Sequence, residues 1–393
     1  MPHNFDEIIN RENTDAIKLE KCKLLFGTEN VLPLWVADMD FRTPDFVLNA
    51  IQKRLEHPVL GYTTTPADFF ELFTAWTQKL HDWQIKTEWT GFIPGIVPGL
   101  AFTVQCFTKP GEEVIVQPPV YHPFMNVVNN NGRDLVYNPL QEVKGKFEMD
   151  FDDLRSKITD KTRMLILCNP HNPGGKVWTL ETLRKLDEIC AKHKILVVSD
   201  EIHADMVLPG DPRIKHIPFA KVSQTAADNS VTFMAPSKTF NMPGLKTSFY
   251  VIPNSKLYQQ FTSYLEASEV KSGNIFAYAA TAACYAEGNH WRKAMLRYVQ
   301  ENVDYVIDFL NKHIPQIRPM RPEASFLMWL DCKALGMEPD ELHHFFVQKA
   351  GLGLNQGTIF GPGGEYHMRL NVACPKVILE QAMTQLKNAL SVQ

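Results

Sequence analysis

The chain has 393 residues, of which 45% are hydrophobic, 21% charged and 11% aromatic, and its formal net charge is −4. This length is sufficient for two domains with a large core, and the composition is that of an ordinary globular protein. A slightly acidic balance without a basic stripe argues against nucleic acid as a partner, and no apolar run reaches the roughly 20 residues that span a membrane.

The N-terminal segment is polar and does not resemble a signal peptide. Seven cysteines are scattered along the chain, without a CxxC pair or a Cys/His spacing that fits zinc. Reduced thiols are typical of the cytoplasm. We therefore expect a soluble cytoplasmic protein without a bound metal ion.

The middle of the chain alternates between short apolar runs and helical patterns. The runs that indicate buried strands lie at 112–117, 163–169, 195–200, 230–235 and 248–252. Residues 179–194, between two of these runs, carry apolar side chains at helical spacing. Alternation of strand and helix predicts an α/β domain around a mostly parallel sheet.

The C-terminal part has a different pattern. It predicts one long amphipathic helix at 290–313, a strand at 325–331, a helix at 338–350 and a last helix that begins near residue 375. This order favours a smaller α+β domain, with which we expect the N-terminal segment to pack. The predicted division is therefore a large domain over residues 45–285 and a small domain that combines 1–44 with 286–393.

Polar side chains follow three successive apolar runs of the predicted sheet. Asn172 follows 163–169, Asp200 ends 195–200 with His203 close behind, and Ser237 and Lys238 follow 230–235. Taken one at a time, these residues fit a turn, a helix cap and a solvated lysine. Because the carboxyl ends of parallel strands meet at the edge where ligands bind, their recurrence favours a binding site.

An amine, a carboxylate and an amide together suit pyridoxal 5′-phosphate. Its aldehyde forms a Schiff base with a lysine, and a carboxylate keeps its ring nitrogen protonated. Its phosphate needs backbone N–H groups at the start of a helix. The stretch Gly-Ile-Val-Pro-Gly at 95–99 opens an apolar helix and is suited to supply them.

Eight motifs, spread almost from end to end, resemble the fold-type I pyridoxal-phosphate enzymes of the class I/II aminotransferase superfamily, and within it the MalY/PatB branch of cystathionine β-lyases, or C–S lyases. They are PLWVADMDF (33–41), LGYT (60–63), GIVPGL (95–100), PPVYHPF (118–124), CNPHNPGGKVWT (168–179), SDEIHAD (199–205), APSKTFNMPGL (235–245) and MRLNVACP (368–375). The resemblance implies an α/β fold in which a large domain with a mostly parallel central sheet is joined to a smaller α+β domain.

For the cofactor ring, the resemblance implies that Lys238 forms the Schiff base and that Asp200 pairs with the pyridine nitrogen. Asn172 and His203 are expected to face the phenolate oxygen, while Tyr121 stacks on the ring. Lys238 and Tyr121 are also the expected catalytic residues, since either is suited to protonate the leaving sulfur.

For the phosphate, the resemblance implies contacts from Ser237 and from the backbone of Ile96 and Val97. Tyr62 is expected to reach the phosphate of the partner subunit, which implies a homodimer with shared active sites. Lys246 stands where aminotransferases often carry an arginine, and it still supplies a positive charge.

For the substrate, the resemblance implies that Arg369 holds the α-carboxylate, helped by Asn172 and by the backbone near Val36 and Ala37. Arginine's planar fork suits this bidentate contact. Asp38 and Asp40, in the same motif, are interpreted as loop-shaping residues and not as a metal site.

The implied activity is β-elimination from cystathionine, cysteine or a related S-conjugate to pyruvate, ammonia and a thiol, with a place in amino-acid metabolism and methionine biosynthesis. The alternative is a class I/II aminotransferase, because the same residues serve transamination. Two further hypotheses rank lower. A regulatory pyridoxal-binding protein would not need the full catalytic set, and an NAD-dependent dehydrogenase would need a GxGxxG after the first strand.

Overall fold

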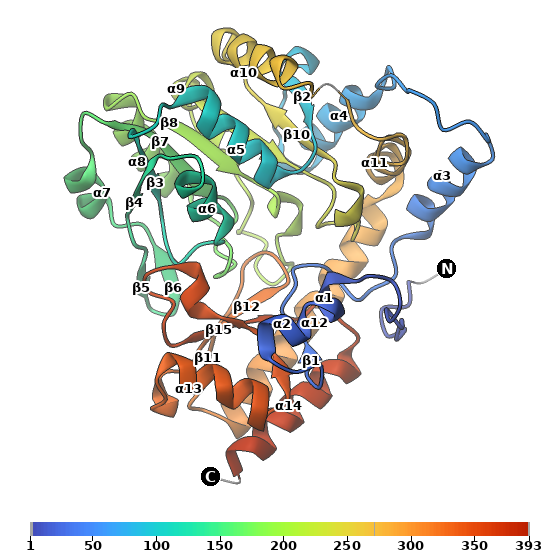
Figure 1. Cartoon of the computed structure of the whole chain (residues 1–393), viewed down its shortest axis with the longest axis vertical. Coiled ribbons are helices and arrows are strands. Elements are labelled where there is room, and N and C mark those ends of the chain that lie inside the picture. The colour runs from blue at the N-terminus through green and yellow to red at the C-terminus, as the bar shows by residue number, and fades with distance from the viewer. Residues whose placement is uncertain (1–2, 271, 392–393) are drawn as a thin grey trace.

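The computed structural model describes residues 3–270 and 272–391, and Figure 1 shows that it is built around two sheets. Within those residues the larger sheet has seven strands in the order β2-β10-β9-β8-β7-β3-β4. They are β2 (Thr90–Ile93), β3 (Glu113–Val116), β4 (Asp134–Tyr137), β7 (Thr162–Cys168), β8 (Leu196–Asp200), β9 (Ser230–Met234) and β10 (Ser248–Val251). All five apolar runs that indicated strands are thus strands of this sheet.

The direction of β10 departs from a parallel arrangement. The strands from β9 to β4 are parallel to one another, whereas β10 runs antiparallel to both β9 and β2. The chain between β9 and β10 contains only the short 3-10 turn Pro243–Leu245. Without a crossover helix the chain returns directly, and an antiparallel neighbour is the result.

Helices cover both faces of the sheet, and its central strands are therefore buried on both sides. On one face lie α5 (Ile96–Phe107), α6 (Pro123–Asn129) and α10 (Ser255–Ala267). On the other lie α4 (Phe69–His81), α7 (Phe151–Lys157), α8 (Leu180–Lys192), α9 (Gln224–Asp228) and α11 (Ile275–Glu287). In β8, for example, Val197 packs on the second face and Val198 on the first.

The smaller sheet is antiparallel and lies toward the lower part of Figure 1. In the described residues its four strands are β11 (Arg318–Met320), β12 (Leu327–Asp331), β15 (His367–Asn371) and β14 (Asn355–Gln356). The N-terminal strand β1 (Leu32–Pro33) pairs in parallel with β13 (Leu352–Gly353). Figure 1 also shows α1 (Ile17–Glu20) and α2 (Cys22–Phe26) beside this part, while α3 (Asp45–Leu55) packs on α11. The domain limits at residues 44 and 285 stay a prediction.

The C-terminal helices largely follow the sequence pattern. The long helix is α12 (Asn289–His313), and α14 (Lys376–Ser391) is the last. The segment expected as one helix at 338–350 is instead α13 (Pro339–His344) followed by a π-helical turn, Phe345–Lys349. There the hydrogen bonds lengthen to i→i+5, as between Ala350 N–H and the Phe345 carbonyl at 3.0 Å. Along the described residues, no helix is both long and apolar enough to cross a membrane.

Candidate active site

The carboxyl ends of β7, β8 and β9 meet at one edge of the large sheet. Cys168 at the end of β7 pairs in register with Asp200 at the end of β8, and Asp200 pairs with Phe233 of β9. The segments that follow these strands open onto one cavity of about 350 Å³. Its wall contains ten of the residues expected from the sequence, namely Ala37, Ile96, Val97, Tyr121, Asn172, Asp200, His203, Ser237, Lys238 and Lys246.

Asp200 is a buried carboxylate at the floor of this site, with 4% of its surface exposed. Its Oδ1 accepts a hydrogen bond from the Ile202 N–H at 3.0 Å, and in the described residues it has no cationic side chain in ion-pair contact. Burial raises the pKa of Asp200 to about 7, partly offset by the Ile202 N–H. A ligand that brings a positive N–H group to this carboxylate would relieve the cost of its ionisation.

Lys238 follows β9 and lines the same cavity, and its pKa is shifted in the opposite direction. Burial lowers its pKa to about 8, while the negative charge of Asp38 opposes that change. Its Nζ donates a hydrogen bond to the Ala37 carbonyl. The lysine therefore loses its proton far more readily than an ordinary lysine, which suits a nucleophilic amine or a general base.

His203 is buried and faces the same cavity. Burial lowers its pKa to about 3, helped by the positive charges of Lys238 and Arg369, so the ring is neutral. Its Nδ1 is buried without a hydrogen-bond partner. A buried polar atom of this kind is costly unless a ligand or water pairs with it.

The loop after β7 gives Asn172 its position. The Tyr121 N–H donates to the Asn172 carbonyl at 3.1 Å, which joins the two cavity walls. The loop turns at Gly175, whose φ is +64° and whose carbonyl accepts the N–H groups of Glu323 and Ala324 at 2.9 Å. A Cβ at residue 175 would lie 2.4 Å from Cβ of Pro322, so only glycine fits this approach.

The start of α5 forms an anion-binding end of the cavity. Gly95, with φ +118°, precedes the helix, and the Ile96 and Val97 amides at its first turn have no partner within the helix. Lys246 adds a cationic side chain to the same wall. Thr247, which the sequence did not single out, also lines the cavity, and its hydroxyl has no hydrogen-bond partner.

Arg369 comes from β15 of the smaller sheet and is 4% exposed. One terminal nitrogen donates to Asn172 Oδ1 at 3.1 Å, the other donates to the Trp35 carbonyl at 2.9 Å and to Asn355 Oδ1, and Nε is buried without a partner. Burial lowers its pKa to about 10, so it remains charged at neutral pH. Phe360 lies under the guanidinium, 5.0 Å from its carbon.

Three expected residues are not part of the wall of this cavity. Arg369 reaches it through its contact with Asn172, Tyr62 is fully exposed in the extended segment before α4, and Val36 lines a neighbouring cavity. Conversely, sequence reasoning missed Cys168, Asn355 and Phe360. Cys168 lines the cavity, while Asn355 and Phe360 hold Arg369. Of these three, only Cys168 had a signal in the sequence, since it lies near the end of the apolar run 163–169.

The residues fit pyridoxal phosphate on this geometry. A buried carboxylate without a cation suits a pyridinium nitrogen, and an amine whose pKa is lowered suits an aldehyde. Helix-start amides beside a lysine suit a phosphate.

The chain belongs to the class I and II aminotransferase family, whose sequence model matches residues 29–386. It is 42% identical to cystathionine β-lyase PatB of Bacillus subtilis, over 99% of this chain and 100% of that protein. It is also 28% identical to protein MalY of Escherichia coli, over 98% of each. These findings confirm the predicted resemblance to the MalY/PatB branch.

Solved structures agree with this assignment. Cystalysin of Treponema denticola, which contains a pyridoxal 5′-phosphate cofactor, superposes with a TM-score of 0.96 at 32% identity, over 100% of both chains. The pyridoxal-phosphate-bound C–S lyase of Staphylococcus hominis superposes with a TM-score of 0.91 at 35% identity, over 99% of this chain and 98% of that one. The predicted fold class, an α/β fold-type I enzyme, is confirmed.

Proposed function

We propose that the protein is a pyridoxal-phosphate-dependent C–S β-lyase that converts cystathionine, cysteine or a related S-conjugate, with water, into pyruvate, ammonia and a thiol. The observation that carries the choice of lyase is the likeness to cystathionine β-lyase PatB over nearly the whole of both chains. The cavity at the ends of β7, β8 and β9 supports the cofactor chemistry independently.

The bound cofactor supplies an electron sink for the negative charge that develops at the substrate Cα. Asp200 would pair with the ring nitrogen of the bound cofactor, because a positive N–H partner would offset the cost of ionising this buried carboxyl. Ser237, the first amides of α5 and Lys246 would hold the phosphate. Asn172 and the neutral ring of His203 would supply the remaining polar contacts to the cofactor.

On the substrate side, Arg369 holds the α-carboxylate, with its unpartnered Nε as the free donor. Lys238, whose pKa burial lowers to about 8, takes the proton from Cα. The C–S bond then breaks with its electron pair leaving on sulfur, which takes up a proton. Lys238 carries the proton removed from Cα, and Tyr121 keeps its phenolic proton because burial raises its pKa, so both are suited to this donation.

The test uses purified protein with pyridoxal phosphate and L-cystathionine, and no 2-oxo acid. Sustained release of pyruvate and free thiol in equal amounts over many turnovers is the expected result. Aminotransferases also fit the family, so they are the alternative. Consumption of one equivalent of substrate per site, without pyruvate and restarted by a 2-oxo acid, would establish a transaminase and overturn the lyase proposal.

The proposal includes a cytoplasmic homodimer in which Tyr62 completes the partner subunit's phosphate site. Its support is that Tyr62 is fully exposed here, beside the exposed apolar side chains of Val59 and Leu60. Mixing a Lys238→Ala protein with a Tyr62→Ala protein, followed by subunit exchange, should restore intact sites to about a quarter of the total, because each hybrid dimer rebuilds one. No recovery in verified hybrids would show that Tyr62 serves no partner.

A further inference from the structure

The loop Val36–Phe41 contacts the reactive amine and lines a second cavity of about 760 Å³. Ala37 and Lys238 line both this cavity and the 350 Å³ cavity of the candidate active site. The Ala37 carbonyl accepts the hydrogen bond from Lys238 Nζ. Met39 and Phe41 are buried in the core and anchor one end of the loop, whereas Asp38 faces the second cavity, so the orientation of its side chain depends on polar contacts.

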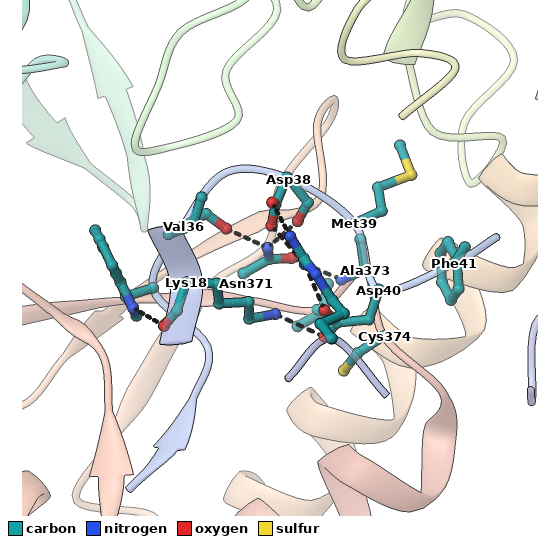
Figure 2. A network of polar contacts seen from close by, with 12 residues as sticks. Lys18, Val36, Asp38, Met39, Asp40, Phe41, Asn371, Ala373 and Cys374 are labelled. Carbon is teal, nitrogen blue, oxygen red and sulfur yellow. Dashed lines mark hydrogen bonds and ion pairs between the residues drawn. The ribbon is translucent and has the colours of Figure 1, made fainter. Parts of the chain in front are cut away.

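Two asparagines hold the backbone of this loop. Nδ2 of Asn371, at the end of β15, donates to the carbonyls of Val36 and Asp38, each at 2.6 Å (Figure 2). Asn241, three residues after Lys238, accepts the Met39 N–H at 3.0 Å and donates to the Met39 and Phe41 carbonyls. These contacts fix the main chain but leave the carboxylate of Asp38 free to rotate.

The N-terminal segment fixes the two carboxylates of the loop. Arg11 forms a forked contact with Asp38, at 2.7 and 3.3 Å, and reaches Asp40 at 3.1 Å. Lys18, which is 3% exposed, meets the other oxygen of Asp40 at 2.6 Å. Figure 2 shows Asp38, Asp40 and Lys18 in this network together with Asn371. A buried lysine and a forked arginine therefore both bind the side chains of this short loop.

We propose that Arg11 and Asp38 are positioning residues for Lys238. Arg11 holds the Asp38 carboxylate toward the amine of Lys238. The N-terminal segment that carries Arg11 is thereby part of the active site. The inference rests on the proposed function only in taking Lys238 as the reacting amine. Asp38 and Arg11 line the second cavity together with Lys238, so the three side chains face one space. The carboxylate supplies negative charge at the amine without touching substrate or cofactor.

The electrostatic surroundings of Lys238 agree with this role. Burial lowers the pKa of the lysine, Asp38 and Asp200 raise it, and Arg369 lowers it. Tyr121, His203, Cys168 and Lys246 line the same cavity. Asp38 raises the pKa of Lys238 more than Asp200 does.

The experiment measures the protonation of Lys238 directly, in the cofactor-free protein. Acetylation of Lys238 by acetic anhydride is followed from pH 6 to pH 10 by peptide mass spectrometry, and the midpoint of its pH dependence is compared among variants. Asp38→Asn is expected to lower the midpoint by about one unit, the size expected from removal of a nearby opposite charge. Asp38→Glu is expected to restore much of that change.

Arg11→Met separates positioning from a direct effect of charge. If Arg11 aims the carboxylate, its loss lets Asp38 turn away, and the Lys238 midpoint falls, although removal of a positive charge by itself would raise it. In the Asp38→Asn background, Arg11→Met should produce no further fall. A rise in the single variant, or an equal fall in both backgrounds, would overturn the proposal.

Arg155→Met is the matched control, because it removes an arginine of α7 that is paired with Asp152 at 2.8 Å on the surface. Its midpoint should equal that of the wild type. If Arg11→Met fails to fold, Arg11→Lys keeps the charge without the fork and should give a smaller fall, while an unchanged midpoint there would count against the fork. Because acetylation needs no cofactor and no substrate, failure of the lyase assay would leave these results standing.

Discussion

The cost of the buried Asp200 carboxylate leads to a prediction on stability. Burial raises the pKa of Asp200 from its ordinary value of 3.8, which the unfolded chain retains, to about 7 in the folded protein. Between these two values the unfolded chain has released the proton and the folded chain retains it. The free energy of unfolding therefore falls as pH rises through this window and is constant above it.

The magnitude follows from the size of the shift. From pH 5 to about pH 7 the free energy of unfolding falls by about 1.4 kcal/mol for each pH unit. Between pH 5 and pH 8, the wild-type protein without cofactor should therefore lose about 3 kcal/mol of stability relative to Asp200→Asn. The asparagine keeps an acceptor for the Ile202 N–H. Any cost of its extra N–H groups does not change with pH, so the slope isolates the ionisation of Asp200.

Urea unfolding of both cofactor-free proteins at pH 5, 6, 7 and 8, at one protein concentration, measures this difference. The advantage of the variant should grow with pH and then level off, and pyridoxal phosphate should remove the trend from the wild type, because its ring nitrogen pairs with the carboxylate. Parallel stability curves for the two proteins across this range would show that Asp200 is not perturbed as the structure indicates.

Three further predictions concern the site. Arg369→Lys removes the forked guanidinium that contacts Asn172. KM for the amino-acid substrate should rise about 10- to 100-fold with a smaller change in kcat, as expected for the loss of a charged hydrogen bond. An unchanged KM in steady-state kinetics would show that Arg369 does not bind the substrate. Gly175→Ala forces φ +64° and a clash with Pro322, so the free energy of unfolding should fall by about 2 kcal/mol or more in urea titrations; equal stability would mean that the loop relaxes. Lys238→Ala should lose the visible absorbance of bound cofactor, and retention of that band would disprove the assignment of the lysine.

The sequence was sufficient to predict the edge of the large sheet that carries the site. Asn172, Asp200 and Lys238 each follow an apolar run, and parallel strands bring such positions together whatever the details of packing. The strand limits also differ by only a residue or two, since wholly apolar runs have few alternative placements. Alternation did not predict the reversed direction of β10, because it depends on the absence of a crossover helix.

The parts of the site that the sequence did not reveal depend on contacts between distant segments. Asn355 and Phe360 belong to short elements. Asn355 reaches Arg369 because β14 pairs with β15, and Phe360 follows in the turn directly after β14. Likewise, Asp38 reads as a polar residue in a loop until Arg11 is seen to approach it from the N-terminal segment. No local pattern encodes such an approach.

The bond between Arg369 and the Trp35 carbonyl joins residues 334 positions apart. Trp35 is made early during synthesis and Arg369 near the end, while Asn172, which Arg369 also contacts, lies between them. The substrate carboxylate therefore has no receptor on the nascent chain until β15 has emerged and docked. A chain that ends before β15 would therefore lack the receptor for the substrate carboxylate, whatever the state of the large sheet.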